Sequence, residues 1–288
     1  MTSTNRAVRI ASILLCLAVF ASASFAKKGN PLNIPRGMAV DSQGNLWVAN
    51  AGTNSILAFN DTYKQLTADT ITAGISEPTG VAFDSLGNLW VTNYDTSTVT
   101  EYTGGVQNTS ATLSSVPLPT AIATDGFNNV WVANSVSDDG FMAVFAPSQV
   151  YGLASQLQTS YGPYPSIFYG IAVSNGALVW GSGSQLAFAP ATDALVTGAL
   201  DGFAIGGENT ATYVASAANG TIYFATTGNL VNYAVPANPG TAVTLVALSF
   251  APTGIAVDSV RGRIYVANGY GNSISVYSTT GTLLHTIN

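Results

Sequence analysis

Few side chains in this sequence could carry acid–base or nucleophilic chemistry. The chain has one His (His285), one Cys (Cys16) and three glutamates, Glu77, Glu101 and Glu208. A nucleophilic triad needs a His or a Lys beside the nucleophile. His285 stands three residues from the end, where we expect a packed or edge residue, and the three lysines lie in the N-terminal tail or a peripheral segment. No triad can be assembled, so the residue types favour a protein that is not an enzyme.

Adjacent carboxylates at Asp138 and Asp139 are the one candidate metal site. Carboxylate and amide oxygens are the ligands that Ca²⁺ takes, and Asn134 stands nearby in the sequence. A solvated turn is the alternative interpretation of this Asp pair. We therefore expect no cofactor, apart from a possible Ca²⁺ at Asp138 and Asp139.

A second group of residues could bind a ligand through hydrogen bonds and aromatic stacking. An Asn recurs directly after four similar apolar runs, where it can either cap the end of a strand or face a ligand. Aromatic and polar residues in connecting loops can recognise sugars or peptides. The candidate ligand-binding residues are Arg36, Asn50, Asn93, Tyr94, Asp95, Asn134, Tyr169 and Asn268.

The composition limits the partners. Only 8% of the 288 residues are charged, 47% are hydrophobic, and the formal net charge is −6. Disordered chains are poor in apolar residues and rich in charge, so we expect a folded protein. Nucleic-acid binding depends on neutralising several phosphates, and eight basic residues in an acidic chain exclude it. A protein, a peptide or a carbohydrate remains as the expected partner.

The N-terminal segment has the features of a secretory signal peptide. Arg6 and Arg9 precede the apolar stretch Ile10–Phe20, and a small-residue cleavage site ends at Ala26. The apolar stretch is shorter than the roughly 20 residues of a spanning helix, although an uncleaved anchor stays open. We expect a signal peptide over residues 1–26, a tail over 27–33, and a secreted, periplasmic or envelope protein without a transmembrane segment in the mature chain.

Residues 34–288 contain an internal repeat. Clear copies of the pattern start at Pro35, Pro78, Pro119 and Pro252, and two degenerate copies lie between the last two. The aromatic residues at the matching position are Trp47, Trp90, Trp131, Trp180, Tyr223 and Tyr265, about 43 residues apart. That period is typical of a four-stranded propeller blade. The sequence predicts an all-β, six-bladed β-propeller of four-stranded blades.

The repeat also predicts which strand lies where. In the first copy the β-type runs are 37–40, 46–49, 55–59 and a weaker 65–71. The first run holds small residues and should be the innermost strand, whereas the second carries the aromatic residue that packs between blades. In the degenerate fifth copy, residues 202–205 are the expected innermost strand.

Four aspartates recur at one place in the repeat. They are Asp41, Asp84, Asp125 and Asp258, each before a turn of small and polar residues. An Asp at the head of a turn accepts hydrogen bonds from backbone N–H groups two residues on. We interpret them as turn-forming residues rather than as a ring of catalytic carboxylates.

The pattern P-x-G-[IVM]-A-[VF]-D…G-N-[LI]-[WY]-V-[AT]-N resembles NHL-repeat propellers and the bacterial YVTN-type surface and secreted propellers. The resemblance covers essentially all of residues 34–288 and implies a propeller rather than one activity. It extends to lactonase propellers, in which Glu, Asn and Asp hold a central metal ion, and to streptogramin B lyases, which employ His. No glutamate of this chain stands on an expected innermost strand.

These observations predict a non-catalytic module that binds a ligand or a protein, or acts as a scaffold, through one loop face. The face is formed by the loops after the second strands and before the innermost strands. The alternative is a Ca²⁺-assisted, lactonase- or lyase-like enzyme on the same face. A propeller that only mediates self-assembly is a third hypothesis.

Overall fold

The structure is a computed structural model that describes residues 29–114, 116–134, 141–145, 168–182, 185–190, 201–204, 213–234 and 243–288. The chain divides into two compact units, Met1–Pro31 and Leu32–Asn288, and all described strands belong to the second. The signal peptide expected over residues 1–26 lies outside the described residues.

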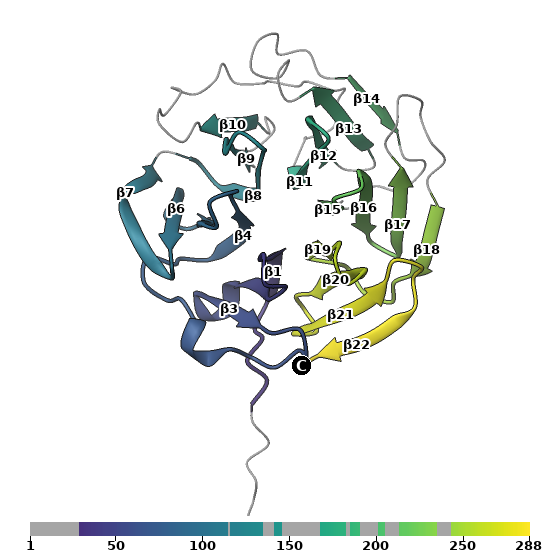
Figure 1. The fold of residues 1–288 in the computed structure, drawn as a ribbon, viewed down its shortest axis with the longest axis horizontal. Coiled ribbons are helices and arrows are strands. Elements are labelled where there is room, and N and C mark those ends of the chain that lie inside the picture. The colour runs from purple at the N-terminus through teal and green to yellow at the C-terminus, as the bar shows by residue number, and fades with distance from the viewer. Residues whose placement is uncertain are drawn as a thin grey trace, which may run out of the picture. The chain divides into compact units, whose positions relative to one another are not determined.

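Antiparallel sheets surround a common axis in the second unit, and the first strand of each sheet lies nearest to this axis (Figure 1). The three-stranded sheets are β1 (Pro35–Val40), β2 (Leu46–Asn50), β3 (Ser55–Phe59) and β8 (Pro119–Thr124), β9 (Val130–Asn134), β10 (Phe141–Phe145). The four-stranded sheets are β4 (Pro78–Phe83), β5 (Leu89–Asn93), β6 (Thr98–Thr103), β7 (Val106–Ser114); β11 (Phe168–Ser174), β12 (Ala177–Ser182), β13 (Gln185–Pro190), β14 (Asp201–Ala204); β15 (Tyr213–Ser216), β16 (Thr221–Thr226), β17 (Asn229–Ala234), β18 (Val243–Ala247); and β19 (Gly254–Asp258), β20 (Arg263–Asn268), β21 (Ser273–Ser278), β22 (Leu283–Ile287).

The fold is an all-β propeller, but the expectation of six uniform four-stranded blades is wrong. The β1–β3 sheet has three strands, because the expected fourth strand at residues 65–71 does not form. The two ends of this segment make only isolated bridges to β3, Phe59↔Gln65 and Ile56↔Ile71. Between them the short 3₁₀ helix η2 (Thr67–Asp69) takes the backbone out of the ladder. The β8–β9–β10 sheet also has three strands among the described residues.

The innermost strand expected at residues 202–205 is also wrong. Asp201–Ala204 is β14, the outermost strand of the β11–β14 sheet, and the innermost strand of the next sheet is Tyr213–Ser216. A tight turn joins this strand to β16, with Ala217 N–H donating to the Thr221 carbonyl at 2.8 Å. The β15–β16 hairpin is therefore much shorter than a hairpin whose innermost strand lies at residues 202–205.

The recurrent aspartates hold the inner hairpins, as predicted. In Asp41 one carboxylate oxygen accepts the backbone N–H groups of Gln43 and Asn45, and the other accepts Asn45 Nδ2 and Trp47 Nε1 at 2.9 Å each. Asp84 and Asp125 repeat this arrangement with Trp90 and Trp131. The bond from the indole, which the sequence analysis did not foresee, fixes each Trp relative to its turn.

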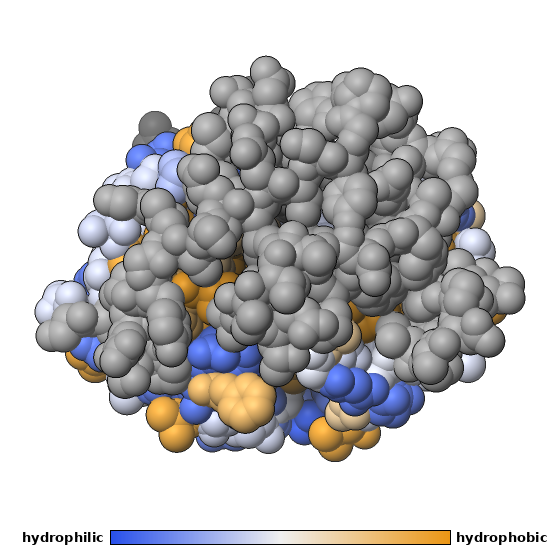
Figure 2. Space-filling view, turned by 90° about the horizontal axis from the view of Figure 1, so that it is seen from above, coloured by the Kyte–Doolittle hydropathy of each residue, from blue (hydrophilic) through white to orange (hydrophobic). Residues whose placement is uncertain are grey.

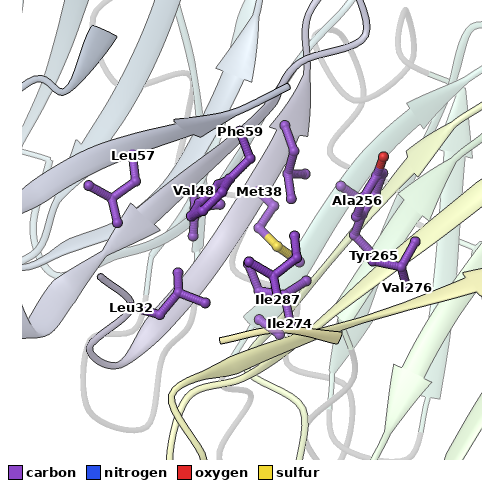
Figure 3. Close-up of a cluster of buried hydrophobic side chains, with 12 residues drawn as sticks. Leu32, Met38, Val48, Leu57, Phe59, Ala256, Tyr265, Ile274, Val276 and Ile287 are labelled. Carbon is purple, nitrogen blue, oxygen red and sulfur yellow. The ribbon is translucent and has the colours of Figure 1, made fainter. Parts of the chain in front are cut away.

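The first and last sheets pack face to face and share no strand. Their contact is a buried cluster in which Met38, Val48 and Phe59 lie near Tyr265, Ile274 and Val276 (Figure 3). Leu32 and Ile287 belong to the same cluster. Packing of apolar side chains, rather than exchange of a strand, brings the two sheets together.

The described surface carries scattered large apolar side chains. Leu86, Phe127 and Val260 stand at equivalent places in three inner hairpin turns and are 75%, 78% and 91% exposed. On the side that Figure 2 shows, small hydrophobic patches lie beside hydrophilic ones. Within the described ranges, the structure contains no helix with the length and hydropathy needed to span a membrane.

Candidate site at the mouth of the central channel

A cavity of about 290 Å³ runs along the axis, between the innermost strands β1, β4, β8, β11, β15 and β19. Most of its lining consists of Gly, Ala and aliphatic side chains. Hydroxyl groups come from Thr79, Thr120, Thr124 and Ser216, together with the tyrosines Tyr169 and Tyr213. Among the described lining residues there is no Asp, Glu, Lys, Arg, His or Cys. The described lining therefore offers apolar contact and hydroxyl oxygens, and no group that is ionised at neutral pH. The Thr79, Thr120, Thr124 and Ser216 hydroxyls donate to backbone carbonyls, so their oxygens remain as acceptors.

Close approach of the innermost strands explains the small residues. A Cβ on Gly254 would lie 2.2 Å from the Arg36 carbonyl oxygen, and one on Gly37 would lie 2.7 Å from Gly80 Cα. Only glycine fits at such a distance from backbone. We therefore expect larger polar and aromatic side chains only where the innermost strands diverge, at the mouth of the channel.

Tyr213 occupies the place that glycine has in most of the other sheets. Tyr213 pairs with Ala225, in the register in which Gly254 pairs with Ala267 and Gly170 pairs with Gly181. Its ring lies 6.0 Å from that of Tyr169, measured between centroids, with the planes tilted by 57°. Both tyrosines are half-buried, so together they form an aromatic wall at one side of the mouth.

Charge interactions at this mouth act on the Tyr213 hydroxyl. Burial, with a smaller contribution from Tyr169, raises the pKa of Tyr213 to about 12, whereas the Arg36 guanidinium acts in the opposite direction. Tyr270 adds a small further rise in this pKa, and its side chain is 88% exposed. At physiological pH Tyr213 is neutral and can both donate and accept a hydrogen bond.

Arg36 forms an ion pair with Glu77 of the neighbouring sheet. The distance from Arg36 Nη2 to Glu77 Oε1 is 2.8 Å, and the two side chains are 30% and 33% exposed. The Glu77 carbonyl accepts the Tyr94 N–H at 3.1 Å, and the adjacent Ser76 donates its hydroxyl to Asp95 at 3.5 Å. The structure thus brings together the predicted residues Arg36, Tyr94 and Asp95 around Glu77.

Asn50 and Asn93 are fully buried, and their amides are hydrogen-bonded to other segments of their own sheets. Asn50 Oδ1 accepts the Asn33 N–H at 2.7 Å, and Asn93 Oδ1 accepts the Ser76 N–H at 3.0 Å. Asn93 Nδ2 also donates to Thr100 Oγ1 at 3.0 Å. These bonds hold the loop before each innermost strand against the end of the second strand.

Asn134 differs, because its amide has no hydrogen-bond partner among the described residues although it is fully buried. In the two sheets above, the bound N–H belongs to the residue seventeen positions earlier. Here that residue is Pro117, which has no N–H. Asn268 lies partly exposed, and its Oδ1 accepts the Gly271 N–H at 2.9 Å.

The expected calcium site at Asp138 and Asp139 lies outside the described residues. Within the described ranges, no three His, Cys, Asp or Glu side chains gather closely enough to hold a metal ion. His285 is exposed on β22, where its ring stacks on Tyr63 at 4.4 Å between centroids. It therefore stands on the outermost strand of its sheet, away from the channel lining.

Two residues of the mouth escaped the sequence analysis. Glu77 stands just before the second copy of the repeat, outside the expected innermost strand, so it was not selected as a site residue. Tyr213 lies in the most degenerate copy, where the innermost strand was placed too early. The sequence does contain a signal for this ion pair. A Glu stands directly before the Pro of one repeat, and an Arg stands directly after the Pro of the preceding repeat.

The ring of antiparallel sheets around a narrow channel defines a β-propeller. Residues 32–59, which contain the β1–β3 sheet, match the NHL repeat family. The structural neighbours described below share the β-propeller fold. No curated protein matches the chain in sequence.

Known structures share the fold at low sequence identity. A streptogramin B lyase is 14% identical, with a TM-score of 0.64, over 90% of this chain and 84% of the lyase. The nidogen/laminin complex contains a chain that is 15% identical, with a TM-score of 0.64, over 82% of this chain and 90% of that one. A gluconolactonase from Xanthomonas campestris is 11% identical, with a TM-score of 0.64, over 83% of this chain and 84% of the enzyme.

Proposed function

We propose that this protein is a non-catalytic binding module that takes an uncharged, hydroxyl-rich ligand, a carbohydrate, at the mouth of its channel. The observation that carries the proposal is the chemistry of the lining. Hydroxyl groups and two tyrosines line a channel whose described residues include no acid, base or metal ligand. The N-terminal Arg6 and Arg9, followed by the apolar stretch Ile10–Phe20, support export as the route to such a ligand.

Aromatic rings suit the apolar face of a sugar, and neutral hydroxyls suit its rim. The ring centroids of Tyr169 and Tyr213 lie 6.0 Å apart and both residues are half-buried, so part of each side chain is open to contact a sugar ring. Arg36 and Glu77 stand nearby with exposed fractions of 30% and 33%. A cavity that combines apolar surface with a few placed polar groups is the usual form of a small-molecule site.

A Ca²⁺-assisted, lactonase- or lyase-like enzyme is the second candidate. It is favoured by structural neighbours that are named as a streptogramin B lyase and a gluconolactonase. At 14% and 11% identity these neighbours support the fold alone.

A glycan array probed with the purified full chain tests the first candidate. We expect retention of neutral glycans, and at least a tenfold loss of retention in Tyr213→Phe, which keeps the ring but removes the hydroxyl of this channel-lining residue. Tyr63→Phe is the matched control, because Tyr63 stacks on His285 away from the channel.

The same protein is then incubated with a panel of lactones, with and without added Ca²⁺. Turnover that requires Ca²⁺ would favour the enzyme and overturn the non-catalytic assignment. If no glycan is retained, or if Tyr213→Phe and Tyr63→Phe bind equally well, the carbohydrate proposal is wrong.

A further inference from the structure

A second hollow, larger than the channel, lies between the first two sheets at the opposite ends of their strands. Its volume is about 640 Å³, and it is bordered by the β1–β2 turn, η2, the β4–β5 turn and the β6–β7 turn. Pro35 pairs with Asn50 at the mouth end of the first hairpin, whereas Val40 pairs with Leu46 at the far end. The hollow, which we call the inter-sheet groove, is therefore separate from the site at the mouth.

One tryptophan of the repeat is left partly open, and it lines this groove. Trp90, Trp131 and Trp180 are buried, with exposures of 7%, 0% and 1%. Trp47 is half-buried and packs edge-on against the half-buried Phe83, with ring centroids 5.8 Å apart and planes at 76°.

The polar atoms of the aromatic side chains in the groove are already bonded. Trp47 Nε1 donates to Asp41 Oδ2 at 2.9 Å, and the Tyr102 hydroxyl donates to the Ala73 carbonyl at 2.6 Å. A ligand therefore meets the Trp47 ring through its hydrocarbon and π surface, whereas Tyr102 is buried, with 1% of its surface exposed. Leu86 and Val106, which are 75% and 71% exposed, extend the apolar surface along the rim.

Three carboxylates line the groove, and its described lining contains no basic residue. They belong to Asp41, Asp69 and Asp84. Within the described residues, the Asp41 and Asp84 carboxylates accept hydrogen bonds from neutral donors: backbone N–H groups, Asn side chains and indoles. These bonds orient the two carboxylates but leave their negative charge in place.

The equivalent Asp258, in the last sheet, has a cationic partner. Arg261 Nη1 lies 3.2 Å from its carboxylate, and the same guanidinium donates to the Gln43 carbonyl at 3.1 Å. Arg261 is thus engaged with Asp258 and with the backbone of Gln43, which lies in the lining of the groove. The carboxylates of Asp41, Asp69 and Asp84 themselves have no ion-pair partner among the described residues, and they lie in the same lining as the open aromatic pair.

From this combination we propose that the inter-sheet groove binds a small organic cation, an alkylated ammonium carried on an apolar body. Positive charge is attracted both to carboxylates and to the faces of aromatic rings. The alkyl groups of such a cation would contact Trp47, Phe83 and Leu86. A volume of about 640 Å³ falls within the range of about 300–1,000 Å³ of small-molecule sites.

Choline and its neutral isostere 3,3-dimethylbutan-1-ol are the probes, and calorimetric titration of the full chain is the measurement. The two molecules have the same shape and differ in charge. We expect choline to bind at least tenfold more tightly, and its affinity to fall as salt is raised from low to high concentration, because salt screens exposed charges. Equal affinity for the two probes, or no binding of choline, would overturn the proposal.

Variants locate the binding without disturbing the core. Asp69 and Leu86 are exposed, so Asp69→Asn and Leu86→Ala should fold normally. Asp69→Asn should weaken choline binding roughly two- to fivefold, the range of an exposed ion pair. Leu86→Ala should weaken both probes alike. Asp95→Asn is the matched control for charge, because Asp95 lies at the mouth; if it weakens choline binding as much as Asp69→Asn does, the groove is not the site.

Discussion

Thr253 Oγ1 donates a 2.6 Å hydrogen bond to the carbonyl of Pro35, and this bond joins the last sheet to the first. The same bond occurs inside the ring, where Thr79 Oγ1 donates to the Pro119 carbonyl at 2.7 Å. Asn272 likewise accepts the Ile34 N–H, just as Asn54 accepts the Glu77 N–H. The contact between the last and first sheets, which we call the seam, therefore has the same hydrogen bonds as a contact between neighbouring sheets inside the ring.

Replacement of Thr253 by Val tests the strength of the seam. Val has nearly the shape of Thr but cannot donate, so the Pro35 carbonyl loses its bond. We expect the free energy of unfolding to fall by about 1 kcal/mol, measured by urea denaturation. Thr79→Val should cost a similar amount, and the exposed Thr280→Val is the control. A seam variant that matches the control would show that the bond contributes nothing.

The buried amide of Asn134 leads to a second, contrasting prediction. Asn134→Leu replaces a buried amide that has no partner among the described residues by an apolar group of similar shape. The free energy of unfolding should change by less than about 1 kcal/mol. Asn93→Leu should instead cost more than about 2 kcal/mol, since the Ser76 N–H and Thr100 hydroxyl lose their partner. Equal losses in the two variants would contradict this account of Pro117.

Backbone strain before the prolines can be relieved. Ile34 has a φ of 52°, and Glu77 and Leu118, also directly before a proline, have 43° and 44°. The left-handed region is costly for a β-branched residue and open to glycine. Because the Ile34 side chain is 41% exposed, Ile34→Gly should raise the free energy of unfolding by about 1 kcal/mol. Leu284→Gly, in the extended strand β22, should lower it.

Alkaline unfolding should report on the buried tyrosines. Tyr213 and Tyr102 have pKa values of about 12 in the folded protein, against 10 for the free side chain, chiefly because they are buried. Between pH 10 and pH 12 the unfolded chain loses these protons and the folded protein keeps them, so stability falls as pH rises. Tyr213→Phe should reduce this fall by up to about 2–3 kcal/mol. Urea denaturation at pH 9 to pH 12 measures it, and an unchanged pH dependence would contradict the assignment.

The repeat in the sequence predicted the propeller, because its glycines and aspartates each have one structural task. Glycine permits the approach of neighbouring strands at Gly37 and Gly254, and Asp41 closes the inner hairpin. Where these residues are missing, the prediction failed: the sheet that begins at Tyr213 has no such glycine, and its strand was placed too early. η2 was missed because residues 65–71 contain no glycine or proline to break a strand.

The site was only partly predictable for a related reason. Arg36 and Tyr169 stand at positions that the repeat places at the mouth, so the sequence could locate them. Their partners, Glu77 and Tyr213, follow from contacts between different sheets, which a single repeat does not encode. The inter-sheet groove likewise depends on how much of Trp47 is exposed. The sequence cannot predict this exposure, because Trp47 is the same residue type, at the same place in the repeat, as the buried Trp90 and Trp131.

The shared cluster of Leu32 and Ile287 has a consequence for the topology of the chain. The order of the sheets around the axis is maintained by side-chain contacts, so covalent continuity is not needed at any particular seam. A circular permutant that links Asn288 to Leu32 by a few flexible residues, and opens the chain at the exposed Gly104–Gly105 turn, should reach the same native ring.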